Sequence, residues 1–281
     1  MKNLSLAVKI GAGFGIVILL LVIVSLFSWR GLSGVDEGFT SYRTLARQTN
    51  LAGRLQANML MVRMNVKDFL LTGSDKDIGQ FNDYVQKMDG FIEEAHKDIQ
   101  HPERAEKIDL ITEHMHQYEK GFRRIVDIRN EQNKIVNAGL RDYGPIMQKS
   151  LNEIMSSAKE DGDAEAAYEA GIALQDMLLG RLYGQKFLST NAAEDFALVK
   201  AEFSNVSKQM SILDGLLQNP SRRALKDKVQ EEAKIYIAAF EQLTKVVYER
   251  NAIVTDSLDR IGPEVAEAVE FVKLSIKEEQ D

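Results

Sequence analysis

The sequence of 281 residues contains no cysteine, only four prolines and a single tryptophan. The lack of cysteine excludes disulfides, thiol redox chemistry and cysteine-ligated metals. Basic residues are not in excess either, because the formal net charge is −7, so the concentrated positive surface that nucleic-acid binding needs is absent. With few prolines, and with 44% hydrophobic and 27% charged residues, long amphipathic helices can continue unbroken. We therefore expect an all-α protein that does not bind nucleic acid.

Sequence motifs for catalysis are missing as well. There is no HExxH, no glycine-rich phosphate loop and no G-x-S-x-G. Two of the four histidines, His114 and His116, stand two residues apart. On a helix they point to different faces, whereas a helical metal pair needs a spacing of three or four. We predict no catalytic residues, no metal site and no cofactor, and therefore expect that the protein is not an enzyme.

One long hydrophobic run is present near the N-terminus. Residues 10–29 contain no charge, and about 20 apolar residues are enough for a helix to cross a bilayer. Lys2 and Lys9 precede the run, and Trp29 and Arg30 follow at the far boundary. A cleaved signal peptide is the competing interpretation. We favour an uncleaved anchor because the run is longer than a usual signal core and no small-x-small cleavage site follows.

The membrane segment divides the chain into three parts. We predict a cytoplasmic N-terminus at residues 1–9, a transmembrane signal anchor at 10–29 and an extracytoplasmic part at 30–281. The last part contains the candidate functional residues.

This last part contains an internal duplication. Residues 59–72 read MLMVRMNVKDFLLT and residues 177–190 read MLLGRLYGQKFLST, with six identities and an offset of 177 − 59 = 118. Residues 133–145 (NKIVNAGLRDYGP) and 251–263 (NAIVTDSLDRIGP) match at the same offset. Chance similarity between amphipathic helices does not explain matching Gly-Pro positions. We infer two copies of one unit.

Each copy is expected to form three helices, the third much longer than the others. Glycine and proline mark their ends. The expected helices are about Val35–Leu71, Lys76–Gln100 and from the HPER turn to Ala158, then Ala164–Ser189, Ala192–Gln218 and Ser221–Lys277. Each third helix would be roughly 80 Å long.

These lengths predict two stacked four-helix bundles built from two long and four short helices, with the first and second helix of each copy stacked end to end. The proximal bundle would take residues of about 35–72, 131–191 and 249–281. The distal bundle would take about 75–130 and 192–248. Pro145 and Pro263, each after a glycine, should kink or locally unwind the long helices.

Four arginines are the candidate ligand-binding residues. Arg63 and Arg181 occupy the same position in the two copies and are expected to face each other in the proximal bundle, while Arg250 and Arg129 continue apolar stripes of the long helices. One alternative is that they snorkel or pair with nearby acids. We favour an anion pocket, because a guanidinium binds a carboxylate with two parallel hydrogen bonds.

Glycines add to the argument for a pocket. Gly180 and Gly184 lie inside an expected helix, where each costs about 1 kcal/mol relative to alanine. We expect them to remove core volume beside Arg181.

The membrane anchor, the two MLxxRxxxxxFLxT segments and the two long plus four short helices resemble the helical bimodular sensor domains of bacterial methyl-accepting chemotaxis receptors. This resemblance implies a bacterial inner-membrane protein with a periplasmic sensor. It also implies a homodimeric receptor that binds a small carboxylate in the proximal module through Arg63, Arg181 and Arg250. Some members carry another arginine one turn before the first of these, where this sequence has Leu60.

The expected function is thus that of the sensing region of a chemoreceptor, which binds a small organic acid and passes a conformational signal across the membrane. The same module on a sensor histidine kinase, engaging a periplasmic binding protein, is the closest alternative. A structural helical adaptor is the third. The resemblance also implies a second membrane helix and a cytoplasmic signalling region, so we expect the sequence to be part of a longer receptor.

Overall fold

The computed structural model describes residues 5–280, apart from the side chains at 31–34, 36, 37 and 280. These residues form helices and no strand, which confirms the all-α fold class. In chain order the elements are α1 (Leu6–Thr72), α2 (Asp75–Asp98), α3 (Pro102–Ile135), the π-helical η1 (Val136–Leu140), α4 (Tyr143–Glu160), α5 (Ala164–Thr190), α6 (Ala193–Leu216), α7 (Pro220–Ala252), the π-helical η2 (Ile253–Leu258) and α8 (Asp259–Gln280). Lys2, one of the lysines behind the expected orientation, and Asp281 lie outside the described residues.

The helices divide into two compact units. Unit 1 comprises the described residues up to His116 and from Gly262 onward, and unit 2 comprises Gln117–Ile261. The boundaries fall within α3 and α8. Each of the two long helical stretches therefore contributes to both units.

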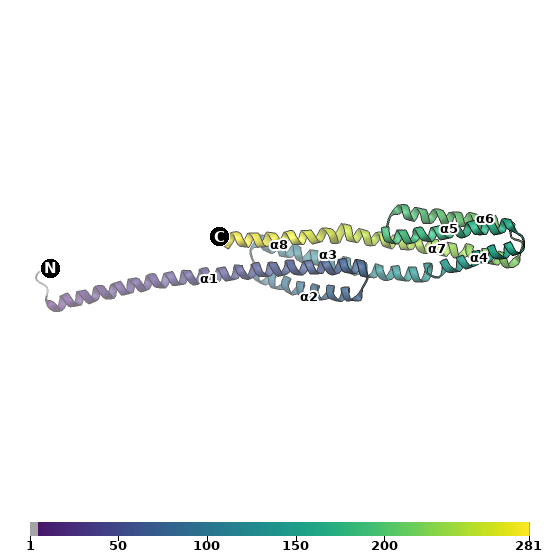
Figure 1. Ribbon diagram of the computed structural model, residues 1–281. Helices are drawn as coiled ribbons and strands as arrows, with labels where there is room; N and C mark the ends of the chain where they lie inside the picture. The colour runs from purple at the N-terminus through teal and green to yellow at the C-terminus, as the bar shows by residue number, and fades with distance from the viewer. Residues whose placement is uncertain (1–4, 281) are drawn as a thin grey trace. The chain divides into compact units, whose positions relative to one another are not determined.

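In unit 1, α1 and α2 lie side by side as a hairpin (Figure 1). The start of α3 contacts α8, where the Lys107 ammonium lies 5.4 Å from the centre of the Phe271 ring. Helix α8 also contacts α1, as shown by the hydrogen bond that Lys273 Nζ donates to Gln56 Oε1 at 3.5 Å. Four helical segments thus form this unit.

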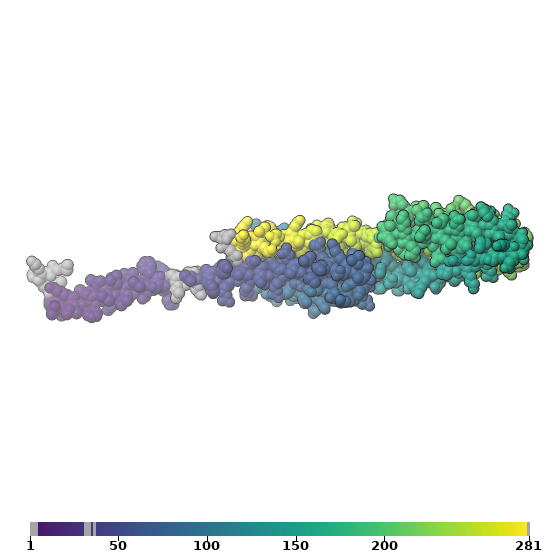
Figure 2. Space-filling model, viewed as in Figure 1, coloured from purple at the N-terminus to yellow at the C-terminus, as the bar shows by residue number. Residues whose placement is uncertain are grey.

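The N-terminal part of α1 is suited to a membrane. The stretch Leu6–Arg30 is long and apolar enough to cross a bilayer, and none of its most hydrophobic window is buried. This stretch includes the expected span at residues 10–29. In Figure 2 the purple N-terminal part of α1 stands free of the other helices of unit 1.

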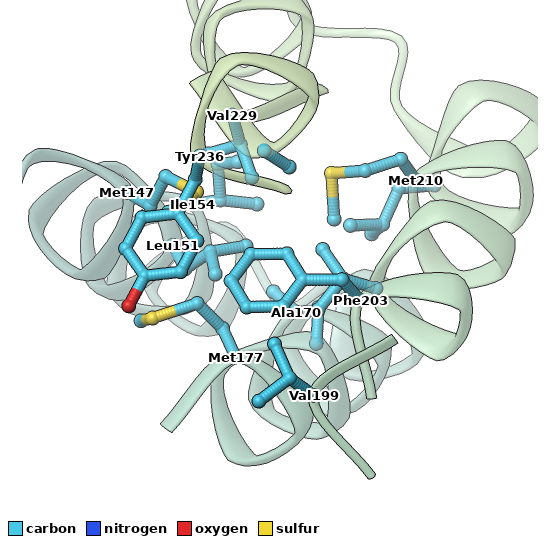
Figure 3. Packing of buried hydrophobic residues seen from close by; sticks show 14 of the residues in the cluster. Met147, Leu151, Ile154, Ala170, Met177, Val199, Phe203, Met210, Val229 and Tyr236 are labelled. Atoms are coloured by element: carbon cyan, nitrogen blue, oxygen red, sulfur yellow. The ribbon is translucent and has the colours of Figure 1, made fainter. Parts of the chain in front are cut away.

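Unit 2 is a closed four-helix bundle. Helix α5 packs on α4 and α6, and α7 also packs on both α4 and α6. Each helix contributes large apolar residues to one core, among them Met147, Met177, Phe203 and Tyr236 (Figure 3). The Phe203 and Tyr236 rings stack with their centres 4.7 Å apart. This core is what holds the candidate site in place.

The pairing of the short helices differs from the expectation. The first helix of each copy was expected to pair with the first helix of the other copy, but α1 packs on α2 and α5 packs on α6. Gly73 (φ 65°) and Asn191 (φ 55°) end the first helices in the left-handed conformation. The next helix begins two residues later, and so short a connection reverses the chain into an antiparallel hairpin. The expected end-to-end stacking was therefore wrong.

The left-handed cap at residue 73 gives a testable prediction. Gly73→Val should lower the free energy of unfolding by about 1–2 kcal/mol, because an L residue with a branched Cβ is strained at this φ. Gly73→Asn should lower the free energy of unfolding by less, since Asn191 occupies the same conformation in the second copy. Urea unfolding of the full chain in detergent, followed by circular dichroism, measures both. Equal losses would show that the backbone conformation at residue 73 is not what matters.

Both long helical stretches leave α geometry shortly before a proline. The π-helical segments η1 and η2 end five residues before Pro145 and Pro263, respectively. A proline removes one helical N–H, and its ring collides with the carbonyl group four residues earlier. The expected local unwinding is confirmed. Such π turns are frequent at functional sites.

The duplication is visible in equivalent contacts of the two units. Arg104 forms an ion pair with Glu279 in unit 1, and Arg222 forms one with Asp161 at 3.0 Å in unit 2. Both arginines are buried, and each pair joins the start of one long stretch to the end of the other. All four residues correspond at the offset of 118 residues. The two units are therefore built on the same plan.

Candidate functional site

Unit 2 contains a cavity of about 530 Å³ between α5, α7 and the η1–α4 junction. Its wall is mostly apolar, with arginine side chains among it. The lining residues are Val136, Leu140, Arg141, Leu178, Arg181, Leu182, Gly184, Gln185, Leu188, Tyr236 and Phe240. A volume of this size, apolar walls and few polar groups are typical of small-molecule sites.

Arg181 is the half-buried cation of this cavity. Its Nη1 donates to Gln148 Oε1 at 3.3 Å, and its guanidinium lies against Gly144, the residue before Pro145. Within residues 5–280 no carboxylate pairs with it. Other buried arginines of the chain do have acid partners, for example Arg222 with Asp161. Arg181 is thus a partly desolvated charge whose counterion the described chain does not supply.

Arg141 is the second cation of the cavity, and it was not among the residues predicted from the sequence. It follows η1 directly, and its N–H donates to the Val136 carbonyl at 2.9 Å across the π turn. Its side chain is exposed, and no acid partner is found for it among the described residues. The sequence does contain a hint of this difference between the copies. At the matched Gly-Pro segments the first copy has Arg141-Asp142, and the second has the reverse order of charges, Asp259-Arg260.

Tyr236 lies on the far wall of the cavity, on α7. Burial raises the pKa of its hydroxyl, and the positive charge of Arg181 acts in the opposite direction. A neutral phenol near the Arg181 guanidinium can donate a hydrogen bond to an anion. The cavity therefore offers donors and positive charge, and no side chain on its lining carries a negative charge.

The two glycines of α5 have a different role from the one expected. A Cβ at Gly180 would lie 2.8 Å from the Phe203 ring, and one at Gly184 would lie 2.9 Å from the Phe240 ring. Aromatic rings, rather than empty space, occupy the room that these glycines leave. Gly184 still lines the cavity, but the glycines serve close packing.

Arg63 belongs to unit 1 and lies in a different place from Arg181. It lines a cavity of about 380 Å³ between α1 and α8, together with Gln56, Leu60 and Gly262. Its guanidinium lies against Gly262, and no acid partner is found for it within the described part of the chain. The expectation that Arg63 and Arg181 face each other in one bundle was wrong, because each first helix packs within its own unit.

Arg129 and Arg250 come close to each other in unit 2, but neither lines the cavity at Arg181. Burial and the charge of Arg129 lower the pKa of Arg250. Arg250 donates from Nη2 to Asn251 Oδ1 at 2.8 Å. The structure thus distributes the four predicted arginines over three places instead of one.

The sequence matches one known family of sensory domains. Residues 3–171, more than half of the chain, match the family described as four helix bundle sensory module for signal transduction. The chain belongs to this family. Such sensory modules serve chemotaxis receptors, so the resemblance stated from the sequence is confirmed at this level. No individual curated protein matches the sequence.

Membership in the sensory-module family agrees with the architecture described above. The matched region runs from the N-terminal helix through the first copy and into α5. A helix fit for a membrane followed by helical bundles is the layout of a membrane-anchored receptor. The cavity at Arg181 includes residues on both sides of the point where the match ends.

Proposed function

We propose that this sensory module binds a small organic anion in the unit 2 cavity, between Arg181 and Arg141. The observation that carries the proposal is that both arginines line one cavity and neither has an acid partner among the described residues. Arg181 is half-buried, and the positive charge of the exposed Arg141 on the same cavity adds repulsion to the cost of its partial desolvation. A carboxylate between them removes this repulsion and completes their hydrogen bonds.

The apolar lining of the cavity limits the class of ligand that it can bind. Leu178, Leu182 and Phe240 form apolar walls, which suit a short carbon skeleton. A guanidinium presents a planar fork to a carboxylate, and paired charge-assisted bonds of this kind are the strong ones. A small mono- or dicarboxylic acid fits this combination better than an amine or a sugar. Binding without chemical conversion is part of the proposal.

Unit 1 holds a second candidate site of the same chemistry. Arg63 lines the smaller cavity there and also has no acid partner among the described residues. The unit 1 cavity has one arginine in its lining and the unit 2 cavity has two, so we place the main site in unit 2. Arg129 and Arg250 form a second pair of positive charges, for which an anion is a suitable partner.

Signalling follows from the position of the membrane helix. We propose that residues 1–9 are cytoplasmic and that residues 30–281 lie in the periplasm of a bacterium, anchored in the inner membrane by α1. We also propose that the receptor acts as a homodimer. A ligand that binds one arrangement of the helices better than another shifts their populations. The continuous stretch of α7, η2 and α8 runs from the cavity into unit 1, and it carries this shift.

A ligand screen tests the proposal. Thermal unfolding of the full chain in detergent is measured with mono-, di- and tricarboxylates, amino acids and amines. A ligand at a hundredfold excess over its Kd stabilises the folded form by about 2.7 kcal/mol. We expect one or more carboxylates to raise the melting temperature. Stabilisation by amines and by no carboxylate would contradict the proposal.

A further inference from the structure

The same arginine–glycine contact occurs once in each unit, each time between a residue of one copy of the duplication and a residue of the other. A Cβ built on Gly144 would lie 2.6 Å from Nε of Arg181, and a Cβ built on Gly262 would lie 2.5 Å from Nε of Arg63. The four residues correspond at the offset of 118 residues. In both units a guanidinium therefore lies directly on helix backbone, in space that any side chain would fill.

Backbone conformation does not require these glycines. The glycines with positive φ are Gly73 and Gly162 among the described residues, whereas Gly144 and Gly262 are helical. Glycine inside a helix costs about 1 kcal/mol relative to alanine. One reason to keep it is the following proline, whose ring crowds the Cβ of the preceding residue. The other reason is the arginine.

The contact determines where the guanidinium lies. Arg181 sits on Gly144 and donates to Gln148, one turn further along α4. Arg141 leaves the backbone three residues before Gly144, at the end of the π turn. The η1–α4 junction thus supplies one arginine of the cavity and the surface on which the other arginine lies.

We propose that Gly144 is a positioning residue for Arg181 in anion binding, and that Gly262 has the same role for Arg63. The absence of a side chain at residue 144 holds the guanidinium against α4, half-buried and at the edge of the cavity. A methyl group there displaces the guanidinium toward solvent. This inference rests on the proposed function for its consequence, and on the arginine–glycine contact for its geometry.

Arginine reactivity tests the geometry without a ligand. The full chain in detergent is treated with phenylglyoxal, and modification of each arginine is followed by peptide mass spectrometry. We expect Gly144→Ala to raise the rate at Arg181 several-fold and to leave Arg63 unchanged. Gly262→Ala, the matched control with the same Gly-Pro backbone, should raise the rate at Arg63 and leave Arg181 unchanged. Unchanged rates at both arginines would overturn the proposal.

Binding gives a second readout, with succinate as the probe in titration calorimetry. We expect Gly144→Ala to weaken succinate binding by about tenfold or more, the effect of losing a charge-assisted hydrogen bond. Gly215→Ala, on α6 of the same unit, adds a methyl group that meets nothing within 4 Å, and it should bind as the parent chain does. A shift in Arg181 reactivity together with no succinate binding to the parent chain would support the positioning role and count against the proposed function.

A third variant covers failure to fold. If Gly144→Ala loses its helical circular dichroism, the double variant Gly144→Ala with Arg181→Met separates the two reasons for the glycine. Methionine is flexible and uncharged and can move off the added methyl group. Restored folding supports the arginine contact, whereas continued loss shows that Pro145 alone requires the glycine and overturns the proposal.

Discussion

Arg181→Ala is expected to weaken binding of the organic acid by about a hundredfold, because truncating one partner of a desolvated charge pair costs about 2–5 kcal/mol. The fold should be retained. Arg181 is half-buried and makes one hydrogen bond of 3.3 Å in the described chain, so its loss leaves no unpaired buried acid. Titration calorimetry with the acid found in the ligand screen measures the affinity, and circular dichroism measures the helical content.

Two variants make this result specific. Arg123→Ala removes an exposed arginine that pairs with Glu119 on the same helix, and it should bind as the parent chain does. Arg181→Lys keeps the charge but loses the planar fork, so it should bind more weakly than the parent chain. Equal affinity of Arg181→Ala and Arg123→Ala would remove Arg181 from the site.

Phe187→Ala is expected to lower the free energy of unfolding by about 3–5 kcal/mol, the usual cost of deleting a buried phenylalanine. The ring is fully buried. It lies 5.5 Å from the Phe240 ring and 6.1 Å from the Phe196 ring, centre to centre, so its removal opens a hole where α5, α6 and α7 meet. Urea unfolding followed by circular dichroism measures the loss.

Tyr168→Ala is the matched control for this large loss. Tyr168 lies on the same helix, but 65% of it is exposed, so the change should stay within about 0.5 kcal/mol. Similar losses for Phe187→Ala and Tyr168→Ala would mean that the core of unit 2 is not organised as described.

Much of the fold was predictable because its signals are local. Apolar spacing defined the helices, and Gly73 marked the end of the first of them. The duplication followed from residues that match at one offset, and the Gly-Pro pairs pointed to the irregular turns that are now seen as η1 and η2. The helices, their ends and the irregular turns depend on a few neighbouring residues, and the duplication needs only a comparison of the sequence with itself.

The pairing of helices was not predictable in the same way. A second helix of about 25 residues can pack along half of a long third helix in two ways. It can continue the direction of the first helix or fold back on the first helix, so helix length alone does not decide which helices pair. The left-handed residues Gly73 and Asn191 decide it, and only a glycine was visible as a helix stop. This one misjudged turn also placed Arg63 and Arg181 in the same bundle.

The candidate site was therefore predicted in part. Arg181 was named from its position in the repeat, and it lines the cavity of unit 2 that carries two arginines. Arg141 was missed because it directly follows a π turn, which shifts side-chain direction away from the helical period used to read the sequence. The role of Gly184 was misjudged, since the Phe240 ring that fills its space comes from a distant part of the chain.

A crystal structure of the chain with the acid found in the ligand screen would show whether the two arginines of unit 2 hold it. We expect a carboxylate within hydrogen-bonding distance of both Arg181 and Arg141, with the carbon skeleton against Leu178 and Phe240. A carboxylate bound at Arg63 in unit 1, with the unit 2 cavity free of ligand, would contradict it.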